Sequence, residues 1–117
     1  MRRTAGFSRR KRLTNSTEFG WVFAYATRSS DKYFTVLSRA NNLPTARLGL
    51  TVSRRVAKHA VDRNRLKRLS REVFRCQQAL PSLDFVVLAN KAAPGADNAE
   101  LRSSLERHLT RLAKQAG

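Results

Sequence analysis

Two segments of the chain space their apolar residues at the interval of an amphipathic helix. The apolar positions of residues 58–78 fall on one side of a helical projection: Leu66, Leu69, Val73 and Cys76, with Leu80 continuing the row. In the second segment, which follows a capping residue at Asp97 or Asn98, the apolar stripe is made of leucines: Leu101, Leu105, Leu109 and Leu112. We therefore expect two long helices, each with one buried face.

A shorter helix is expected over residues 16–26. Asn15 and Glu18 have the spacing of a capping box, with Asn in place of the usual Ser or Thr. Its apolar positions recur on one face: Phe19, Val22, Phe23 and Ala26. Phenylalanines at this spacing usually pack in a core, although they can also form a platform for a ligand.

Three segments have the composition of β-strands. Residues 33–40 are rich in β-branched and aromatic side chains, and residues 84–91 contain a nearly continuous apolar run, typical of a strand buried on both faces. Turn residues at 41–45 predict that residues 46–54 return as an antiparallel partner of 33–40, and residues 28–32 are interpreted as a polar loop. The expected fold is α+β, an α/β sandwich with one small sheet and the order α-β-β-α-β-α.

The polar side of the segment 58–78 is strongly basic. Between Arg63 and Arg75 there are six basic residues, and most of them lie with Asn64 within an arc of about 140° on a helical projection. The arc consists of Arg63, Asn64, Lys67, Arg68, Arg71 and Arg75, and Arg65 lies at its boundary. A solvated helix face is the alternative, but it would normally interleave glutamates with the cations.

The charge of the whole chain points to a polyanionic partner. Its 117 residues carry 24 Lys and Arg against 8 Asp and Glu, a formal net charge of +16. Nucleic acid is the leading candidate and an anionic membrane surface is the competitor. No apolar run approaches the ~20 residues of a membrane-spanning helix, and no secretory signal is recognisable. Because Cys76 is the single cysteine, we expect neither disulfides nor a thiolate metal site, and a cytoplasmic location.

The domain organisation is expected to be simple. Residues 1–12 contain six basic residues and little that is apolar, so we expect a flexible basic arm that orders on a partner. An unstructured terminus without a role is the alternative. Residues 13–117 are expected to form a single RNA-binding domain.

The sequence offers little for catalysis by the polypeptide itself. Of the eight acidic residues, four lie at expected helix starts, where a carboxylate complements the helix dipole: Glu18, Asp62, Asp97 and Glu100. His59 is expected at a helix start and His108 at the margin of the last helix, and neither has metal-ligand spacing. Glycine-rich phosphate loops, nucleophile elbows and redox cysteine pairs are missing from the sequence. Aromatic residues near the sheet, such as Tyr33 and Phe34, could instead stack unpaired bases.

Four blocks of sequence, in order, resemble the protein subunit of bacterial ribonuclease P. The most specific runs from Arg63 to Arg75 and reads RNRLKRxxRExFR. The others are Glu18-Phe19-x-x-Val22-Phe23, the segment 48–55 (LGLTVSRR) and the segment 84–89 (DFVVLA). Together they cover roughly residues 14 to 110.

This resemblance implies a fold in which the strand–helix–strand crossover is left-handed, against the general rule. It implies that the catalyst is an associated RNA that uses Mg²⁺, held mainly by that RNA, and that the protein binds no cofactor alone. The reaction that the resemblance implies is hydrolytic removal of the 5′ leader from precursor tRNA. The implied partners are the catalytic RNA and precursor tRNA, with no membrane and no further protein required.

The resemblance also implies roles for individual residues. The catalytic RNA would contact the basic helix at Arg63, Asn64, Arg65, Lys67, Arg68 and Arg71. The leader would lie in a cleft between the first helix and the sheet, against Phe19, Phe23, Phe34 and Arg54. One departure is Asn90, where family members commonly carry a basic residue. A general RNA-binding protein, such as a ribosomal protein, and a protein-only nuclease remain the alternative functions.

Overall fold

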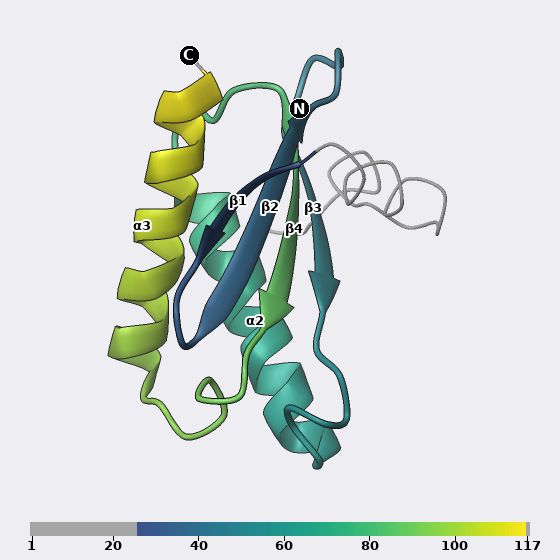
Figure 1. Cartoon of the computed structure of the whole chain (residues 1–117), viewed down its shortest axis with the longest axis vertical. Helices are drawn as coiled ribbons and strands as arrows, with labels where there is room; N and C mark the ends of the chain where they lie inside the picture. Colours follow the sequence, from purple (N-terminus) through teal and green to yellow (C-terminus); the bar gives the residue numbers. More distant parts are fainter. Residues whose placement is uncertain (1–25, 117) are drawn as a thin grey trace.

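The computed structural model describes residues 26–116. The basic arm 1–12, most of the helix expected over 16–26, and both Phe19 and Phe23 lie outside these residues. The described chain forms four strands and two helices: β1 Thr27–Ser30, β2 Phe34–Ala40, β3 Arg47–Thr51, α2 Ala60–Cys76, β4 Leu83–Ala89 and α3 Asn98–Ala116. The strands form one sheet in the order β1-β2-β4-β3 (Figure 1). The structure is therefore α+β, as the sequence predicts.

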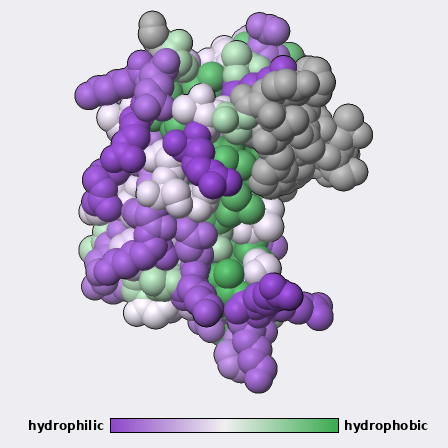
Figure 2. Space-filling view, viewed as in Figure 1, coloured by the Kyte–Doolittle hydropathy of each residue, from purple (hydrophilic) through white to green (hydrophobic). Residues whose placement is uncertain are grey.

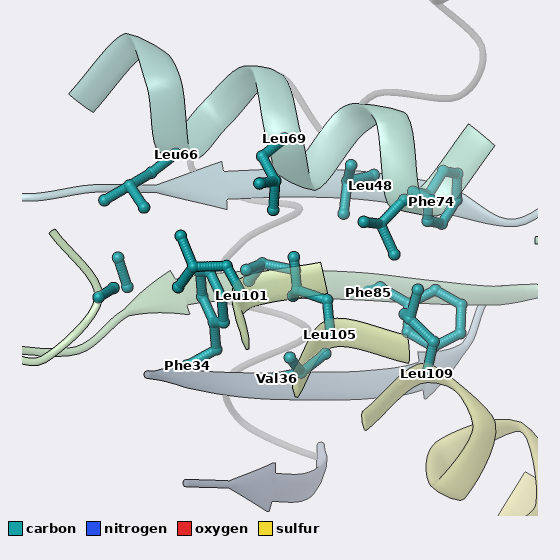
Figure 3. Close-up of a cluster of buried hydrophobic side chains, with 14 of the residues drawn as sticks. Phe34, Val36, Leu48, Leu66, Leu69, Phe74, Phe85, Leu101, Leu105 and Leu109 are labelled. Atoms are coloured by element: carbon teal, nitrogen blue, oxygen red, sulfur yellow. The ribbon is translucent and has the colours of Figure 1, made fainter. Parts of the chain in front are cut away.

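The two helices cover one face of the sheet, and the hydrophobic core lies between the layers. The helices contribute side chains such as Leu66, Leu69 and the leucine stripe of α3, while the strands contribute Phe34, Val36 and Phe85 (Figure 3). Phe74 of α2 packs edge-on against Phe85, with ring centroids 5.9 Å apart. Cys76 is exposed, contrary to the expected apolar row, because α2 ends at this residue.

The connection from β3 through α2 to β4 determines the handedness of the fold. β3 and β4 are parallel neighbours, with Arg47 opposite Asp84 and Thr51 opposite Leu88. In Figure 1 both strands run downwards, α2 passes behind the sheet, and β4 lies to the left of β3. This crossover is left-handed, the uncommon hand for such a connection.

Two expectations about the strands are wrong. β3 does not pair with β2, because β4 lies between them and pairs antiparallel with β2 and parallel with β3. Residues 27–30, which overlap the segment 28–32 interpreted as a loop, form the edge strand β1 antiparallel to β2. β1 has the sequence TRSS, so it lacks the apolar alternation by which a strand is recognised.

Local sequence explains where α3 begins. The Asp97 carboxylate accepts a hydrogen bond from the Glu100 backbone N–H (2.9 Å), and the Glu100 carboxylate accepts one from the Asp97 N–H (3.5 Å). This reciprocal capping box satisfies two donors that the helix cannot pair internally. None of the helices within residues 26–116 is long and apolar enough to cross a membrane.

Candidate nucleic-acid interface

The outward face of α2 contains a basic surface hollow of about 310 Å³. We call it the α2 hollow, and it is lined by Asn64, Arg68, Arg71, Glu72 and Arg75. The opposite side of the helix is anchored in the core by Leu66, Leu69 and Val73. Because that side is packed, the basic side chains project from a fixed helix, and guanidinium groups held in this way can engage phosphate in two-pronged fashion.

Arg63 and Arg65 lie outside the α2 hollow and bond to the protein itself. The Arg63 guanidinium donates to the carbonyls of Ala57 (3.0 Å) and Lys58 (2.9 Å), which satisfies acceptors just before the helix. Arg65 donates to the Asn98 side chain (3.1 Å) and to the carbonyls of Pro94 (3.3 Å) and Ala96. These bonds fix α2 to the segment that leads into α3.

Lys67 and the predicted leader contact Arg54 also lie outside the α2 hollow. Lys67 is half-buried on α2, and Arg54 is exposed in the turn that follows β3. Of the six residues predicted to contact the catalytic RNA, the structure thus brings Asn64, Arg68 and Arg71 together. Arg75 joins them, as its place in the basic arc had indicated.

Phe34 does not belong to a leader-binding surface. Its side chain is completely buried in the cluster between the sheet and the helices, where Val36 and Phe85 accompany it. Strand alternation explains this, since Phe34 points to the helix-covered face and its neighbour Thr35 to the opposite, open face. The prediction for Phe34 is wrong. Phe19 and Phe23 are outside the described residues, and their contacts stay predictions.

The open face of the sheet carries apolar and basic side chains together. Leu37 and Val86 form a buried cluster at its centre, with Ala26 and Leu88 packed against them. The strand register places Arg28 opposite Leu37, and Arg39 opposite Asp84, on the same face. Figure 2, which looks onto this face, shows apolar surface over the strands bordered by hydrophilic side chains. Because Leu37 and Val86 are buried, the groups that this face offers to nucleic acid are basic side chains such as the exposed Arg28, which can contact phosphates.

Asn90, the departure from the family pattern, has an internal role at the end of β4. Its side-chain amide donates to the Asp31 carbonyl (2.8 Å) and lies 3.1 Å from the Thr35 hydroxyl. Its backbone N–H donates to the Tyr33 carbonyl at 2.8 Å. Asn90 therefore holds the turn between β1 and β2 against the end of β4.

His108 is buried, whereas the sequence pattern predicted it at the margin of the last helix. Its Nδ1 atom is hydrogen-bonded to the Ser29 hydroxyl (2.6 Å), and its Nε2 atom lies 3.2 Å from an Asp31 carboxylate oxygen without hydrogen-bond alignment. Burial lowers the pKa of His108, and the Asp31 carboxylate opposes this only in part. The sequence does contain a signal for this burial, because His108 falls in the leucine stripe of α3, three residues after Leu105.

Asp31 is kept ionised within the same cluster. Burial alone would raise its pKa, but hydrogen bonds from the Ser104 hydroxyl (2.6 Å) and from the backbone N–H groups of Phe34 and Tyr33 outweigh it. The pKa of Asp31 is thereby lowered to about 2. Through these contacts the cluster joins α3 to β1 and to the turn between β1 and β2, so we assign it a role in stabilising the fold.

Comparison with known proteins identifies the family. The family model described as Ribonuclease P matches residues 7–113. The chain belongs to the ribonuclease P protein family. It is 50% identical over 104 residues to the ribonuclease P protein component of Methylococcus capsulatus, covering 88% of this chain and 81% of that protein.

Solved ribonuclease P proteins share the fold. The structure of the Staphylococcus aureus RNase P protein has a TM-score of 0.81 and 26% identity, covering 86% of this chain and 94% of that one. The RNase P protein from Thermotoga maritima has a TM-score of 0.75 and 31% identity, covering 88% and 96% of the two chains. This ribonuclease P family member thus has the small mixed sheet and two packed helices of its relatives.

Proposed function

We propose that this chain is the protein component of a ribonuclease P ribonucleoprotein and assists a catalytic RNA in removing the 5′ leader from precursor tRNA. Membership of the ribonuclease P protein family supports the reaction. The observation that carries the docking of RNA is the α2 hollow, where three arginines and Asn64 project from a helix anchored in the core. Phosphates accept charge-assisted hydrogen bonds from such a fixed array.

The two faces of the sheet support a division of roles. The α2 hollow lies on the helix side, and we assign it to the catalytic RNA. The open face carries Arg28 and Arg39 around the buried Leu37 and Val86, and we assign its basic side chains to the leader. Phe19, Phe23 and Arg54 stay the proposed leader contacts, whereas Phe34 is excluded by its burial. A sheet between the two surfaces would keep catalyst and leader on separate sides of the protein.

We assign the chemistry of the reaction to the RNA. Within residues 26–116 no three His, Cys, Asp or Glu side chains are grouped so that they could hold a metal ion. The side chains of residues 26–116 therefore do not fit a Mg²⁺ ion held by the protein. In this proposal Mg²⁺ is held mainly by the RNA, and the polypeptide alone is not catalytic.

The docking proposal is tested by titrating the protein with its cognate catalytic RNA and with an unrelated structured RNA of equal length. We expect tighter binding of the cognate RNA, weakened by Arg68→Ala or Arg71→Ala. Each removed phosphate contact should lower the slope of log affinity against log salt by about 1. Equal affinity for both RNAs would favour the general RNA-binding protein instead.

A further inference from the structure

A second basic surface lies on the outward face of α3, away from the α2 hollow. This surface is a shallow hollow of about 570 Å³, which we call the α3 hollow. It is lined by Ser103, Glu106, Arg107, Thr110, Arg111 and Lys114. Figure 2 shows hydrophilic side chains along the left edge of the molecule, where Figure 1 places α3. Three cations and one acid line it, and two hydroxyl groups add further hydrogen-bond donors.

The spacing of these cations does not stabilise the helix through pairs of opposite charge, although Lys114 in the last turn complements the helix dipole. Arg107 and Arg111 are four residues apart, and Arg111 and Lys114 are three apart, so like charges adjoin on the helix surface. Glu106 is one, five and eight residues from the three cations, which are not the spacings of helical neighbours. A merely solvated helix would gain by alternating the signs of these charges. The arrangement instead suits an anionic partner.

Contacts with residues outside α3 hold the side chains of two cations of the α3 hollow in place. Arg111 donates to the Ser29 hydroxyl at 3.1 Å, and an Arg107 nitrogen lies 3.6 Å from the Asp31 carboxylate. The Arg107 side chain is nevertheless 61% exposed, so its remaining donors can reach a ligand. The guanidinium groups are thus partly positioned before binding, which lowers the entropic cost of ordering them.

The position of the α3 hollow indicates which RNA it would meet. α2 and α3 cover the same face of the sheet and pack against each other, and the Arg102–Glu72 ion pair (2.9 Å) joins them. Glu72 also lines the α2 hollow, so the two basic surfaces are separated by this neutralised pair. An RNA docked on α2 would therefore have α3 beside it, whereas the open face lies across the sheet.

We propose that the α3 hollow binds the sugar–phosphate backbone of the catalytic RNA, at a segment other than the one that docks on α2. The inference rests on the proposed function. Two docking surfaces on adjacent helices would fix the orientation of the protein on the RNA, which a single helix contact leaves free to rotate. Arg107, Thr110, Arg111 and Lys114 supply the donors.

The test compares variants that remove positive charge inside and outside the α3 hollow. Lys114→Gln and the double variant Arg107→Gln/Lys114→Gln remove cations from the hollow, and Lys91→Gln is the control for one lost charge because Lys91 is exposed in the turn after β4, outside both hollows. We expect Lys114→Gln to weaken catalytic-RNA binding by about threefold to tenfold and to lower the salt slope by about 1. The double variant should lower the slope by about 2. Lys91→Gln should bind like wild type, and thermal unfolding should confirm that all three variants are folded.

A second measurement locates the contact. An iron chelate tethered to Thr110→Cys in a Cys76→Ser background should cleave the bound catalytic RNA at a segment different from that cleaved from Asn64→Cys. Hollow variants that bind like Lys91→Gln, while Arg68→Gln weakens binding, would overturn this inference and leave the proposed function intact. Weakened binding of precursor tRNA alone would also overturn it. A wild-type protein that does not prefer the catalytic RNA would refute the proposed function and this inference with it.

Discussion

Arg47 and Asp84 form a two-pronged ion pair directly across the parallel strands β3 and β4. The Arg47 Nε and Nη2 atoms donate to the two Asp84 carboxylate oxygens, each at 2.8 Å, and the two side chains are 17% and 7% exposed. The Asn41 amide also donates to Asp84, at 2.9 Å. The pair thus ties both ends of the crossover that carries α2.

Removing the carboxylate should be costly because a mostly buried guanidinium loses two charge-assisted hydrogen bonds. We expect Asp84→Ala to lower the free energy of unfolding by about 3 kcal/mol, measured by urea denaturation. Arg102→Gln, which breaks the exposed pair with Glu72, should cost less than about 1 kcal/mol. Equal losses in the two variants would contradict a special role of the Arg47–Asp84 pair.

His108 should make stability depend on pH. The pKa of His108 is lowered in the folded protein from its ordinary 6.5, so below pH 6.5 the unfolded chain binds a proton that the folded chain resists. The free energy of unfolding should therefore fall as pH decreases from about 6.5. The groups around the ring are Ser29, Asp31, Arg107 and Arg111.

Two variants separate this effect from that of Asp31. His108→Gln should flatten the pH dependence just below 6.5. The pKa of Asp31 is lowered from 3.8 to about 2, so its contribution to the free energy of unfolding is present above pH 3.8 and is lost as pH falls toward 2. Asp31→Asn should remove this decline in stability at low pH. Urea unfolding at a series of pH values measures both. An unchanged slope near pH 6 in His108→Gln would refute the assignment to His108.

Arg65 and Arg68 should have opposite phenotypes although they are three residues apart on α2. Arg65→Gln removes bonds to the segment 94–98, so we expect a loss of about 1–2 kcal/mol in the free energy of unfolding. Arg68→Gln should leave stability unchanged and weaken binding of the catalytic RNA. Denaturation and RNA titration of both variants check this. If Arg65→Gln weakened RNA binding without loss of stability, the sequence-based role of Arg65 would be right.

Phe34 should affect stability and not leader recognition. Phe34→Ala is expected to cost about 3–5 kcal/mol because it leaves a cavity in the fully buried core. Phe34→Leu keeps most of the volume and should lose less. Under conditions where both variants are folded, the holoenzyme should bind precursor tRNA as tightly as wild type. A variant that folds normally but recognises the leader poorly would restore Phe34 to the leader site.

The helices and most strands could be predicted from the sequence because their signals are local. The capping box at Asp97 and the leucine stripe of α3 place that helix, and the apolar run from Phe85 marks a strand buried on both faces. The pairing of β2 with β3 was predicted wrongly, since a turn between two strands does not reveal that β4 will lie between them. β1 lacks an apolar pattern and depends on its pairing with β2.

The site could be predicted as a helix face, but not residue by residue. Helical periodicity placed Asn64, Arg68 and Arg71 on one surface. It could not show that Arg65 binds the backbone before α3, because those carbonyls are about 30 residues away in sequence. Nor could it show that His108 bonds to Ser29, which lies 79 residues away on an edge strand. Such contacts depend on tertiary structure alone.

Cleavage of precursor tRNA at low Mg²⁺ tests the central proposal most directly. We expect the protein alone to release no leader, the catalytic RNA alone to be slow, and the two together to release the 5′ leader much faster. Arg68→Ala should reduce this stimulation at limiting protein and recover at higher protein concentration, since it weakens docking and not chemistry. Leader release by the RNA-free protein, or no stimulation at any Mg²⁺ concentration, would contradict the account.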